Sequence, residues 1–448
     1  MFDKLLEEGF LEPIDLYFAG LYPTNDIDVK AYLAAVMQSA RYGHLCLDLQ
    51  TLSEPSNWAK AVKAGAAKSP ASPYLVTENA LVYLEKNHRY ETEVMQELKR
   101  LLGASPLPKI EADLTDEQQV AFDLVRSENV SIIEGGPGTG KTFLTTELVK
   151  SFGSGARIIL TAPTGKAAAR LKSKNPHAYS GTLHALLGIN HAGHRAYLAA
   201  DLIIVDEASM IDVNMLRILL KSLPAGQRIV FLGDGKQLPP IESGSLFNDL
   251  IDLIPTAHLT KSLRSDRKEI LDLAASILEG KAPQPHGPLS HDAIKQHVKE
   301  NSAAILTPLR EGPWGVKALN ELLQGSQKET PIIITRNDAE TGLSNGDMGF
   351  IISPKMAQFE NRQIPIAALP PYEPAYALSI HKSQGSEFDH VVVLAPPGTE
   401  VFGREVLYTA VTRARQSVTL LGDAEVIAKT VSTSSCRRSG IKIRWWLV

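Results

Sequence analysis

The hydrophobic pattern of the chain changes at a linker that follows a helical first segment. Before the linker, apolar residues such as Val94, Leu98 and Leu101 recur three and four positions apart, which is the spacing of one buried helix face. Residues 104–108 contain a serine and two prolines and have the composition of a linker. The pattern therefore predicts a small, mostly helical N-terminal domain over residues 1–108.

Short apolar runs alternate with helical runs after the linker. Continuous apolar runs are typical of strands that are covered on both faces of a parallel sheet. A proline-rich segment, 281–288, separates two sets of them, so we predict an α/β fold with two further domains, 109–262 and 263–448. The predicted strands are 130–133, 157–160, 202–205 and 228–232 in the first set, and 304–306, 331–334, 391–394 and 418–421 in the second.

The composition fits a soluble protein of several domains. The chain has 448 residues, of which 44% are apolar and 21% charged. It has no run of about 18 apolar residues that could span a membrane, and its first residues lack the basic and apolar regions of a signal peptide. Cys46 and Cys436 are too far apart in sequence to suggest a disulfide framework or a zinc site. We expect a cytoplasmic protein.

The net charge of −4 does not indicate a protein that binds nucleic acid through a general excess of basic surface residues. Any DNA must therefore bind in a local channel. The basic C-terminal residues are either part of such a contact or a solvated tail; they are Arg437, Arg438, Lys442 and Arg444.

A phosphate-binding loop follows the first predicted strand. Residues 135–142 fit the pattern G-x-x-x-x-G-K-[ST], and a helical run comes directly after them. Backbone N–H groups of such a loop cradle phosphates at a helix N-terminus. We expect Lys141 to reach the β- and γ-phosphates of ATP and Thr142 to hold Mg²⁺. The predicted nucleotide-binding residues of the loop are Gly135, Gly136, Pro137, Gly138, Thr139, Gly140, Lys141 and Thr142.

An acidic pair follows the strand 202–205. Asp206 is expected to bind in the Mg²⁺ shell, and Glu207 to orient or activate the attacking water. Gln118 precedes the phosphate-binding loop, and its amide could select adenine. Alternatively, Thr115 and Gln118 form a helix capping box, and both interpretations can hold together.

Further polar residues distinguish a motor from other nucleotide hydrolases. Gln237 ends another strand of the first domain and can sense the γ-phosphate. Arg264 and Arg413 come from the second domain, and arginine supplied across a cleft stabilises charge on the transferring phosphoryl group. Each of these arginines, taken alone, also fits a surface ion pair. Glu387 is assigned to the nucleotide, with DNA as the alternative.

The ordered set of motifs resembles that of superfamily 1 DNA helicases, and within them the RecD family. Examples are Ala-Pro-Thr-Gly-Lys at 162–166 and His-Lys-Ser-Gln-Gly at 381–385. The resemblance covers nearly the whole chain. The segments that carry it are 43–47, 114–121, 134–142, 162–171, 182–188, 205–210, 233–239, 307–315, 345–349, 381–389 and 409–415.

The resemblance implies two RecA-like domains with parallel sheets that hold ATP and Mg²⁺ between them. It also implies 5′→3′ translocation on single-stranded DNA, unwinding of tailed duplexes, and assembly with RecB-like and RecC-like subunits. That complex, of the exodeoxyribonuclease V type, acts in double-strand-break repair and recombination. The implied DNA-facing residues are Thr164, Lys166, Thr182, His184, Asn345, Ser379, His381, Lys382 and Ser383.

The chain departs from the RecD pattern in three places. Residues 350–376 offer little material for the β-barrel insert of the family, and only 189–198 remain for a strand-separating hairpin. Ser265 stands where the family pattern has glutamine. One alternative is therefore a non-unwinding, DNA-binding scaffold subunit with only DNA-stimulated ATP hydrolysis. Another alternative is a P-loop hydrolase that acts on protein.

Overall fold

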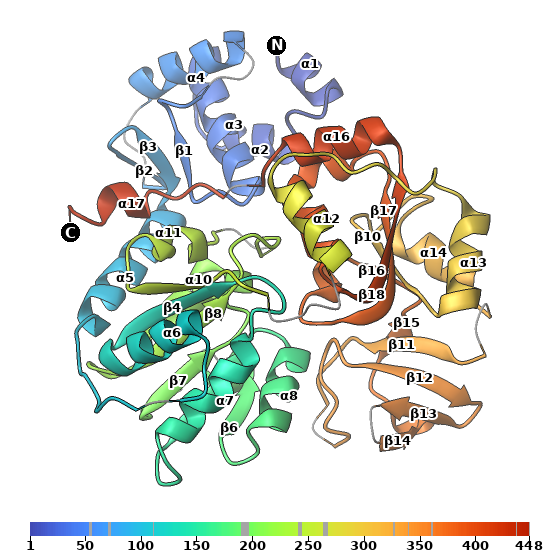
Figure 1. Cartoon of the computed structure of the whole chain (residues 1–448). Helices are drawn as coiled ribbons and strands as arrows, with labels where there is room; N and C mark the ends of the chain where they lie inside the picture. The colour runs from blue at the N-terminus through green and yellow to red at the C-terminus, as the bar shows by residue number, and fades with distance from the viewer. Residues whose placement is uncertain are drawn as a thin grey trace.

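The computed structural model contains a mostly helical N-terminal region, two parallel sheets of six and four strands, and a five-stranded antiparallel sheet (Figure 1). No helix within the described ranges is long and apolar enough to cross a membrane. The structure describes residues 1–52, 56–69, 73–110, 112–189, 197–240, 244–262, 268–325, 328–338, 340–359, 362–435 and 437–447.

The N-terminal region is mostly helical, as predicted, but it also contains a small antiparallel sheet in the order β1-β3-β2. Strands of three or four residues are too short to give a clear period-2 signal. Asn79 and Ala80 join β2 to β3 and both have a positive φ. The elements are α1 (Phe2–Glu7), α2 (Pro13–Gly20), α3 (Ile27–Arg41), β1 (Cys46–Asp48), α4 (Ser56–Lys68), β2 (Leu75–Glu78), β3 (Leu81–Leu84) and α5 (Glu85–Leu101).

The first parallel sheet has six strands in the order β6-β5-β7-β8-β4-β9. Leu98 and Leu101 of α5 share one apolar core with Ile203 and Val205 of β7, so the N-terminal region packs directly on this sheet. The elements are α6 (Asp116–Ser127), β4 (Val130–Gly135), α7 (Lys141–Ser151), β5 (Ile158–Ala162), α8 (Gly165–Lys174), β6 (Tyr179–Thr182), α9 (Leu183–Leu186), β7 (Leu202–Val205), η1 (Ala208–Met210), α10 (Val213–Lys221), β8 (Ile229–Gly233), α11 (Phe247–Ile251) and β9 (Thr256–Leu259).

The second parallel sheet has four strands in the order β16-β10-β17-β18. Apolar residues of α12 and α15 cover one face of it. The elements around this sheet are α12 (Lys268–Leu278), α13 (His291–Asn301), β10 (Ala304–Thr307), α14 (Val316–Leu323), β16 (Ala377–Ser379), η4 (His381–Ser383), β17 (Phe388–Ala395), η5 (Thr399–Phe402), α15 (Arg404–Val411), β18 (Ala414–Gly422) and α16 (Ala424–Ser432).

The prediction that 331–334 belongs to this parallel sheet is wrong. The run forms part of a five-stranded antiparallel sheet, β14-β13-β12-β11-β15, with a small apolar core that includes Ile332 and Phe359. The insert therefore draws on more chain than 350–376, because β11 lies before that range. The elements are β11 (Thr330–Ile334), β12 (Met348–Ser353), β13 (Met356–Phe359), β14 (Arg362–Pro365), η3 (Ile366–Ala368) and β15 (Tyr372–Pro374). Of the predicted hairpin, residues 190–196 lie outside the described residues.

The C-terminal segment 437–447 leaves the second parallel sheet and lies against the N-terminal region and the first sheet (Figure 1). It contains α17 (Ile441–Arg444). Arg444 is only 2% exposed and forms an ion pair with the buried Glu91. Arg444 is therefore neither a DNA contact nor part of a solvated tail, which corrects both interpretations of this residue.

Candidate nucleotide site between the two parallel sheets

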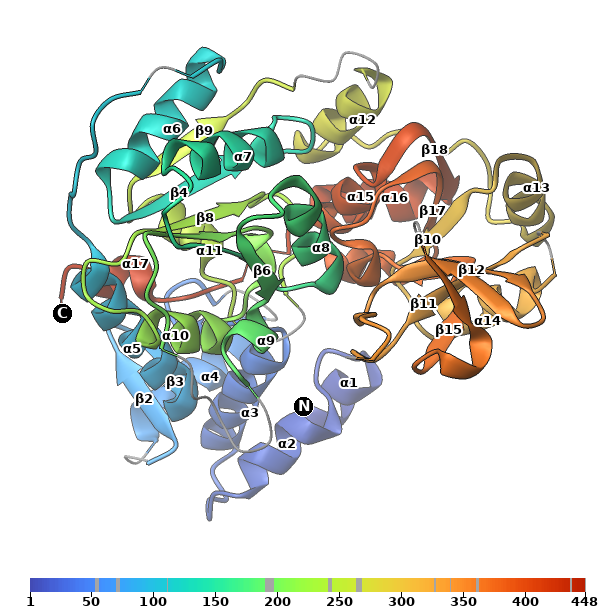
Figure 2. The ribbon, with the colours of Figure 1, turned by 90° about the horizontal axis from the view of Figure 1, so that it is seen from below.

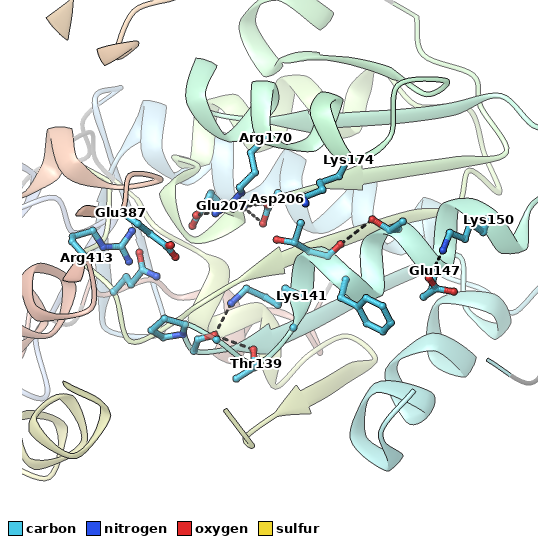
Figure 3. Close-up of a pocket in the computed structure, with 18 residues that line it drawn as sticks. Thr139, Lys141, Glu147, Lys150, Arg170, Lys174, Asp206, Glu207, Glu387 and Arg413 are labelled. Atoms are coloured by element: carbon cyan, nitrogen blue, oxygen red, sulfur yellow. Dashed lines mark hydrogen bonds and ion pairs between the residues drawn. The ribbon is translucent and has the colours of Figure 1, made fainter. Parts of the chain in front are cut away.

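The phosphate-binding loop joins β4 to α7 at the carboxyl edge of the first sheet. Gly138 and Gly140 have φ values of 80° and 87°, which are strained for residues with a side chain, so the loop needs glycine there. The loop borders a cavity of about 530 Å³. Figure 3 shows Lys141 on one wall, Asp206 and Glu207 on another, and Arg413 with Glu387 entering from the second sheet's side.

Lys141 is held at the mouth of the loop by backbone carbonyls. Its ammonium donates to the Gly135 oxygen and, at 3.0 Å, to the Gly136 oxygen. The Thr139 hydroxyl donates to the same Gly136 oxygen at 2.9 Å. These contacts keep a positive charge beside the N-terminus of α7, where phosphate oxygens bind in loops of this kind. Contact of Lys141 with the β- and γ-phosphates stays a prediction.

The acidic pair stands at the end of β7 and faces the same cavity. Asp206 and Glu207 are 3% and 8% exposed, and the Glu207 N–H donates to the Asp206 carboxylate at 2.9 Å. Glu207 has a φ of 53°, an unusual conformation for a non-glycine residue that is often found at functional sites. Burial and the neighbouring charge of Asp206 raise the pKa of Glu207. A carboxylate with a raised pKa is a stronger general base, which suits activation of water.

Arg170 of α8 is a site residue that the sequence prediction missed. Its guanidinium lies 3.0 Å from the Asp206 carboxylate and 3.5 Å from that of Glu207. Burial opposes its charge, but the two carboxylates outweigh burial and raise the pKa of Arg170. One signal was available, because Lys166, Arg170 and Lys174 recur every four residues along one helix that follows a strand.

Gln237 lines the cavity from the first parallel domain, and Arg413 lines it from the second. The Gln237 amide nitrogen donates to Asp234 at 3.2 Å, while its buried amide oxygen has no hydrogen-bond partner among the described residues. Arg413 is 5% exposed and donates through Nε to the Thr409 carbonyl at 3.1 Å. Glu387 lines the cavity and pairs with Arg415 at 3.1 Å. The predicted Arg264 lies outside the described residues.

Gln118 is the N3 residue of a capping box on helix α6, whose N-cap is Thr115, and it supports the loop. Its side-chain oxygen accepts from the Thr115 N–H at 3.2 Å, and the Thr115 hydroxyl accepts from the Gln118 N–H at 3.4 Å. Its amide nitrogen donates to the Thr139 carbonyl at 3.3 Å. The capping box is therefore present and is tied to the phosphate-binding loop. Adenine selection by Gln118 remains a prediction.

The residues predicted to face DNA divide into two groups. Thr164 and Thr182 are the N-caps of α8 and α9, and His184 is exposed. A Cβ placed on Gly165 would lie 2.4 Å from Ser344, so glycine allows α8 to meet the turn that carries the exposed Asn345. The N-terminus of α8 thus lies beside the turn of the second domain that carries Asn345, and α8 faces that domain in Figure 2.

The second group lies around η4, where Ser379 and Ser383 are buried and Lys382 is exposed. Ser383 is fully buried and donates to the Ile380 carbonyl at 2.7 Å, so its predicted contact with DNA is not supported. Ser379 is 4% exposed and lines a groove with Lys382. Burial, with the charges of nearby arginines, lowers the pKa of His381 to about 4, so this histidine is neutral at neutral pH. Lys166 lies over the Phe388 ring at 5.7 Å.

Two family models match the chain. The AAA domain covers residues 113–299, and the UvrD-like helicase C-terminal domain covers residues 374–421. The RecBCD enzyme subunit RecD of Mycobacterium tuberculosis is 27% identical over 548 residues, covering 98% of this chain and 95% of that protein. The RecD subunit of Haemophilus influenzae is 29% identical and covers 73% of this chain and 72% of its own length. Over nearly its whole length, this chain is similar to the RecD subunits of RecBCD enzymes.

Other comparisons agree with this family and with the fold. The ATP-dependent RecD2 DNA helicase of Deinococcus radiodurans is 30% identical over 81% of this chain, which matches 59% of that protein. A Bacteroides Pif1 structure bound to single-stranded DNA has a TM-score of 0.51 and 20% identity, and covers 70% of this chain and 94% of that one. At that identity the likeness shows the fold, with its two RecA-like domains.

The chain is shorter than its mycobacterial relative. Their alignment runs over 548 residues, whereas this chain has 448, so at least 100 alignment positions fall opposite gaps in it. Of the residues predicted to be catalytic, Lys141, Asp206, Glu207, Gln237 and Arg413 line the one cavity.

Proposed function

We propose that this chain is an ATP-dependent DNA helicase or translocase that moves 5′→3′ as the RecD-like subunit of a RecBCD-type complex. The observation that carries the proposal is the meeting of Lys141, Glu207 and Gln237 with Arg413 at one cavity. The first three come from the first parallel domain, and Arg413 comes from the second. Hydrolysis in such a cleft changes the contacts between two domains, which is what a translocating motor requires.

Each residue of the cavity has a separate chemical task in this proposal. Thr142 and Asp206 line the cavity, and their hydroxyl and carboxylate oxygens are ligands that Mg²⁺ prefers, so they would hold the ion. When bound, Mg²⁺ supplies positive charge between the β- and γ-phosphates. Glu207 takes the proton of the attacking water, and Lys141 with Arg413 stabilises charge on the transferring phosphoryl group.

Single-stranded DNA is proposed to cross the junction of α8 with the 344–346 turn. Thr164, Lys166 and Asn345 stand there and can hold phosphates without reading bases. In support, the Pif1 neighbour of similar fold is described as bound to single-stranded DNA. Hydrolysis that opens and closes the cleft would move these phosphate contacts relative to one another.

The proposed partners are RecB-like and RecC-like subunits in the cytoplasm, because several relatives are named as RecBCD subunits. The proposed process is double-strand-break repair by recombination, and the proposed substrates include tailed duplexes. The shorter chain favours one second candidate, a subunit that hydrolyses ATP on DNA without unwinding it alone.

Steady-state ATP hydrolysis with and without single-stranded DNA tests the proposal. We expect DNA to raise the hydrolysis rate and Lys141→Ala to abolish it, because the loop loses its phosphate-facing cation. Lys429→Ala, an exposed lysine of α16, is the matched control and should keep the wild-type rate. Hydrolysis that DNA does not stimulate would contradict the proposal and favour a P-loop hydrolase that acts on protein.

A further inference from the structure

The loop that carries Gln237 is held against the second parallel domain by a group of buried hydrogen bonds, which we call the clamp. Three hydrogen bonds cross from the second parallel domain to residues Asp234–Leu238 of the first. The Tyr408 hydroxyl donates to the Asp234 carboxylate at 2.8 Å. The Thr409 hydroxyl accepts from the Leu238 N–H at 2.8 Å, and the Gln384 amide donates to the Leu238 carbonyl at 3.0 Å.

Asp234 is the centre of this clamp. It is 1% exposed, and its Oδ2 accepts both the Tyr408 hydroxyl and the amide nitrogen of Gln237. Its Oδ1 accepts the Lys236 N–H at 3.0 Å. A buried carboxylate needs such donors, so its position depends on where each of them stands. One of the three donors, the Tyr408 hydroxyl, belongs to the second domain. The position of Asp234 therefore depends on whether the two domains are closed.

Tyr408 also lies close to the phosphate-binding loop and to the arginine of its own domain. A Cβ placed on Gly136 would lie 3.3 Å from the Tyr408 hydroxyl, so the ring reaches the loop that holds Lys141. The adjacent Thr409 carbonyl accepts from Arg413 Nε at 3.1 Å. Tyr408 contacts Asp234, which holds Gln237, and its neighbour Thr409 contacts Arg413.

The Tyr408 hydroxyl keeps its proton and so can donate a hydrogen bond. Tyr408 is 4% exposed, and burial together with the charge of Asp234 raises its pKa well above the ordinary tyrosine value. The hydroxyl therefore stays protonated over the whole working pH range and keeps its hydrogen bond to the carboxylate.

We propose that Tyr408 is a positioning residue for ATP hydrolysis, because its hydrogen bond to Asp234 orients the Gln237 amide only when the two domains are closed. This inference rests on the proposed ATP-driven motor. Gln237 is held at its nitrogen by Asp234, which leaves its oxygen to accept a hydrogen bond in the cavity. Tyr408 lies on α15, and Arg413 follows that helix. The Gln237 amide is therefore oriented when domain closure brings Arg413 into the cavity.

The test is Tyr408→Phe, which removes one hydroxyl and keeps the ring. We expect kcat for DNA-stimulated hydrolysis to fall about 10- to 100-fold, the effect of misplacing a catalytic group. KM for ATP should stay within about twofold, because ground-state contacts with the phosphates are unchanged. Asp234→Asn, a second variant of the same size, should show the same split. The double variant should be no worse than the single ones, because both break one unit.

Tyr376→Phe is the matched control. Tyr376 is also buried in the second domain, at 2% exposure, but its hydroxyl lies 3.5 Å from Thr330, away from the cleft. A merely structural role predicts that the two tyrosine variants behave alike, and that result overturns this inference alone. Absence of ATP hydrolysis in the wild type overturns the proposed function as well.

Discussion

Arg444 anchors the C-terminal segment in the N-terminal region, and its replacement by methionine gives a sharp prediction. The guanidinium donates to Glu91 at 2.9 Å, to Glu78 at 2.8 Å and to the Thr92 hydroxyl at 2.6 Å. Arg444→Met keeps an apolar stem and removes the charge. Glu91 is fully buried, and it would keep only the Tyr83 hydroxyl and the Gly440 N–H as donors.

The expected cost follows from the charge that is left behind. Removing one partner of a buried ion pair typically costs about 3–5 kcal/mol, because the remaining charge is uncompensated. The contact with the more exposed Glu78 adds little, as is usual for ion pairs near the surface. We therefore expect Arg444→Met to lower the free energy of unfolding by about 3–5 kcal/mol at neutral pH.

The loss should depend on pH. Burial raises the pKa of Glu91 above its ordinary 4.5, although Arg444 opposes this shift. Without Arg444 the pKa of Glu91 rises further. A carboxyl whose folded pKa is raised destabilises the native state only where it must ionise, at pH values above its unfolded pKa. The cost of Arg444→Met should therefore be largest near neutral pH and shrink as pH falls towards the unfolded pKa of Glu91.

The assay is urea unfolding followed by circular dichroism, at about pH 8 and about pH 5. Lys442→Met is the matched control, because this residue of the same helix pairs with the exposed Asp252 and should cost less than about 1 kcal/mol. Glu91→Gln combined with Arg444→Met should be less destabilised than Arg444→Met alone. Equal losses for Arg444→Met and Lys442→Met, or a pH-independent loss, would refute the reasoning.

Three further predictions concern the nucleotide site. Glu207→Gln should lower kcat for ATP hydrolysis about 10²- to 10⁴-fold while a fluorescent ATP analogue still binds, because only proton transfer is lost. Arg413→Ala should lower kcat about 10³-fold or more with little change in nucleotide affinity, whereas Arg415→Ala, on the exposed side of β18, should have a small effect. Gln118→Ala should lower the free energy of unfolding by about 1 kcal/mol through the lost cap. Loss of nucleotide binding in Glu207→Gln, or equal kcat values for the two arginine variants, would contradict these roles.

The phosphate-binding loop and the acidic pair could be predicted because each is a local pattern. The loop that carries Lys141 follows β4 and Asp206 follows β7, and the loop conformation depends on glycines that are visible in the sequence. The two parallel sheets were predicted for the same reason, since their strands are continuous apolar runs. The run 331–334 was misassigned because an apolar strand of an antiparallel sheet has the same composition.

Other features depend on contacts between distant residues, and no local pattern contains them. Arg444 and Glu91 are 353 positions apart, so the return of the C-terminal segment could not be deduced from either. Tyr408 and Asp234 are 174 positions apart. Arg170 lay inside a recognised motif, but its pairing with the acidic residues follows from the packing of α8 on β5, the strand next to β7 in the sheet.

The central claim is that ATP hydrolysis in this cavity drives movement along DNA in one direction. The most direct test is unwinding by the purified chain of duplexes that carry either a 5′ or a 3′ single-stranded tail, with Lys141→Ala beside the wild type. The account predicts ATP-dependent unwinding of the 5′-tailed duplex only, abolished in Lys141→Ala. Unwinding of the 3′-tailed duplex, or unwinding that survives in Lys141→Ala, would contradict it.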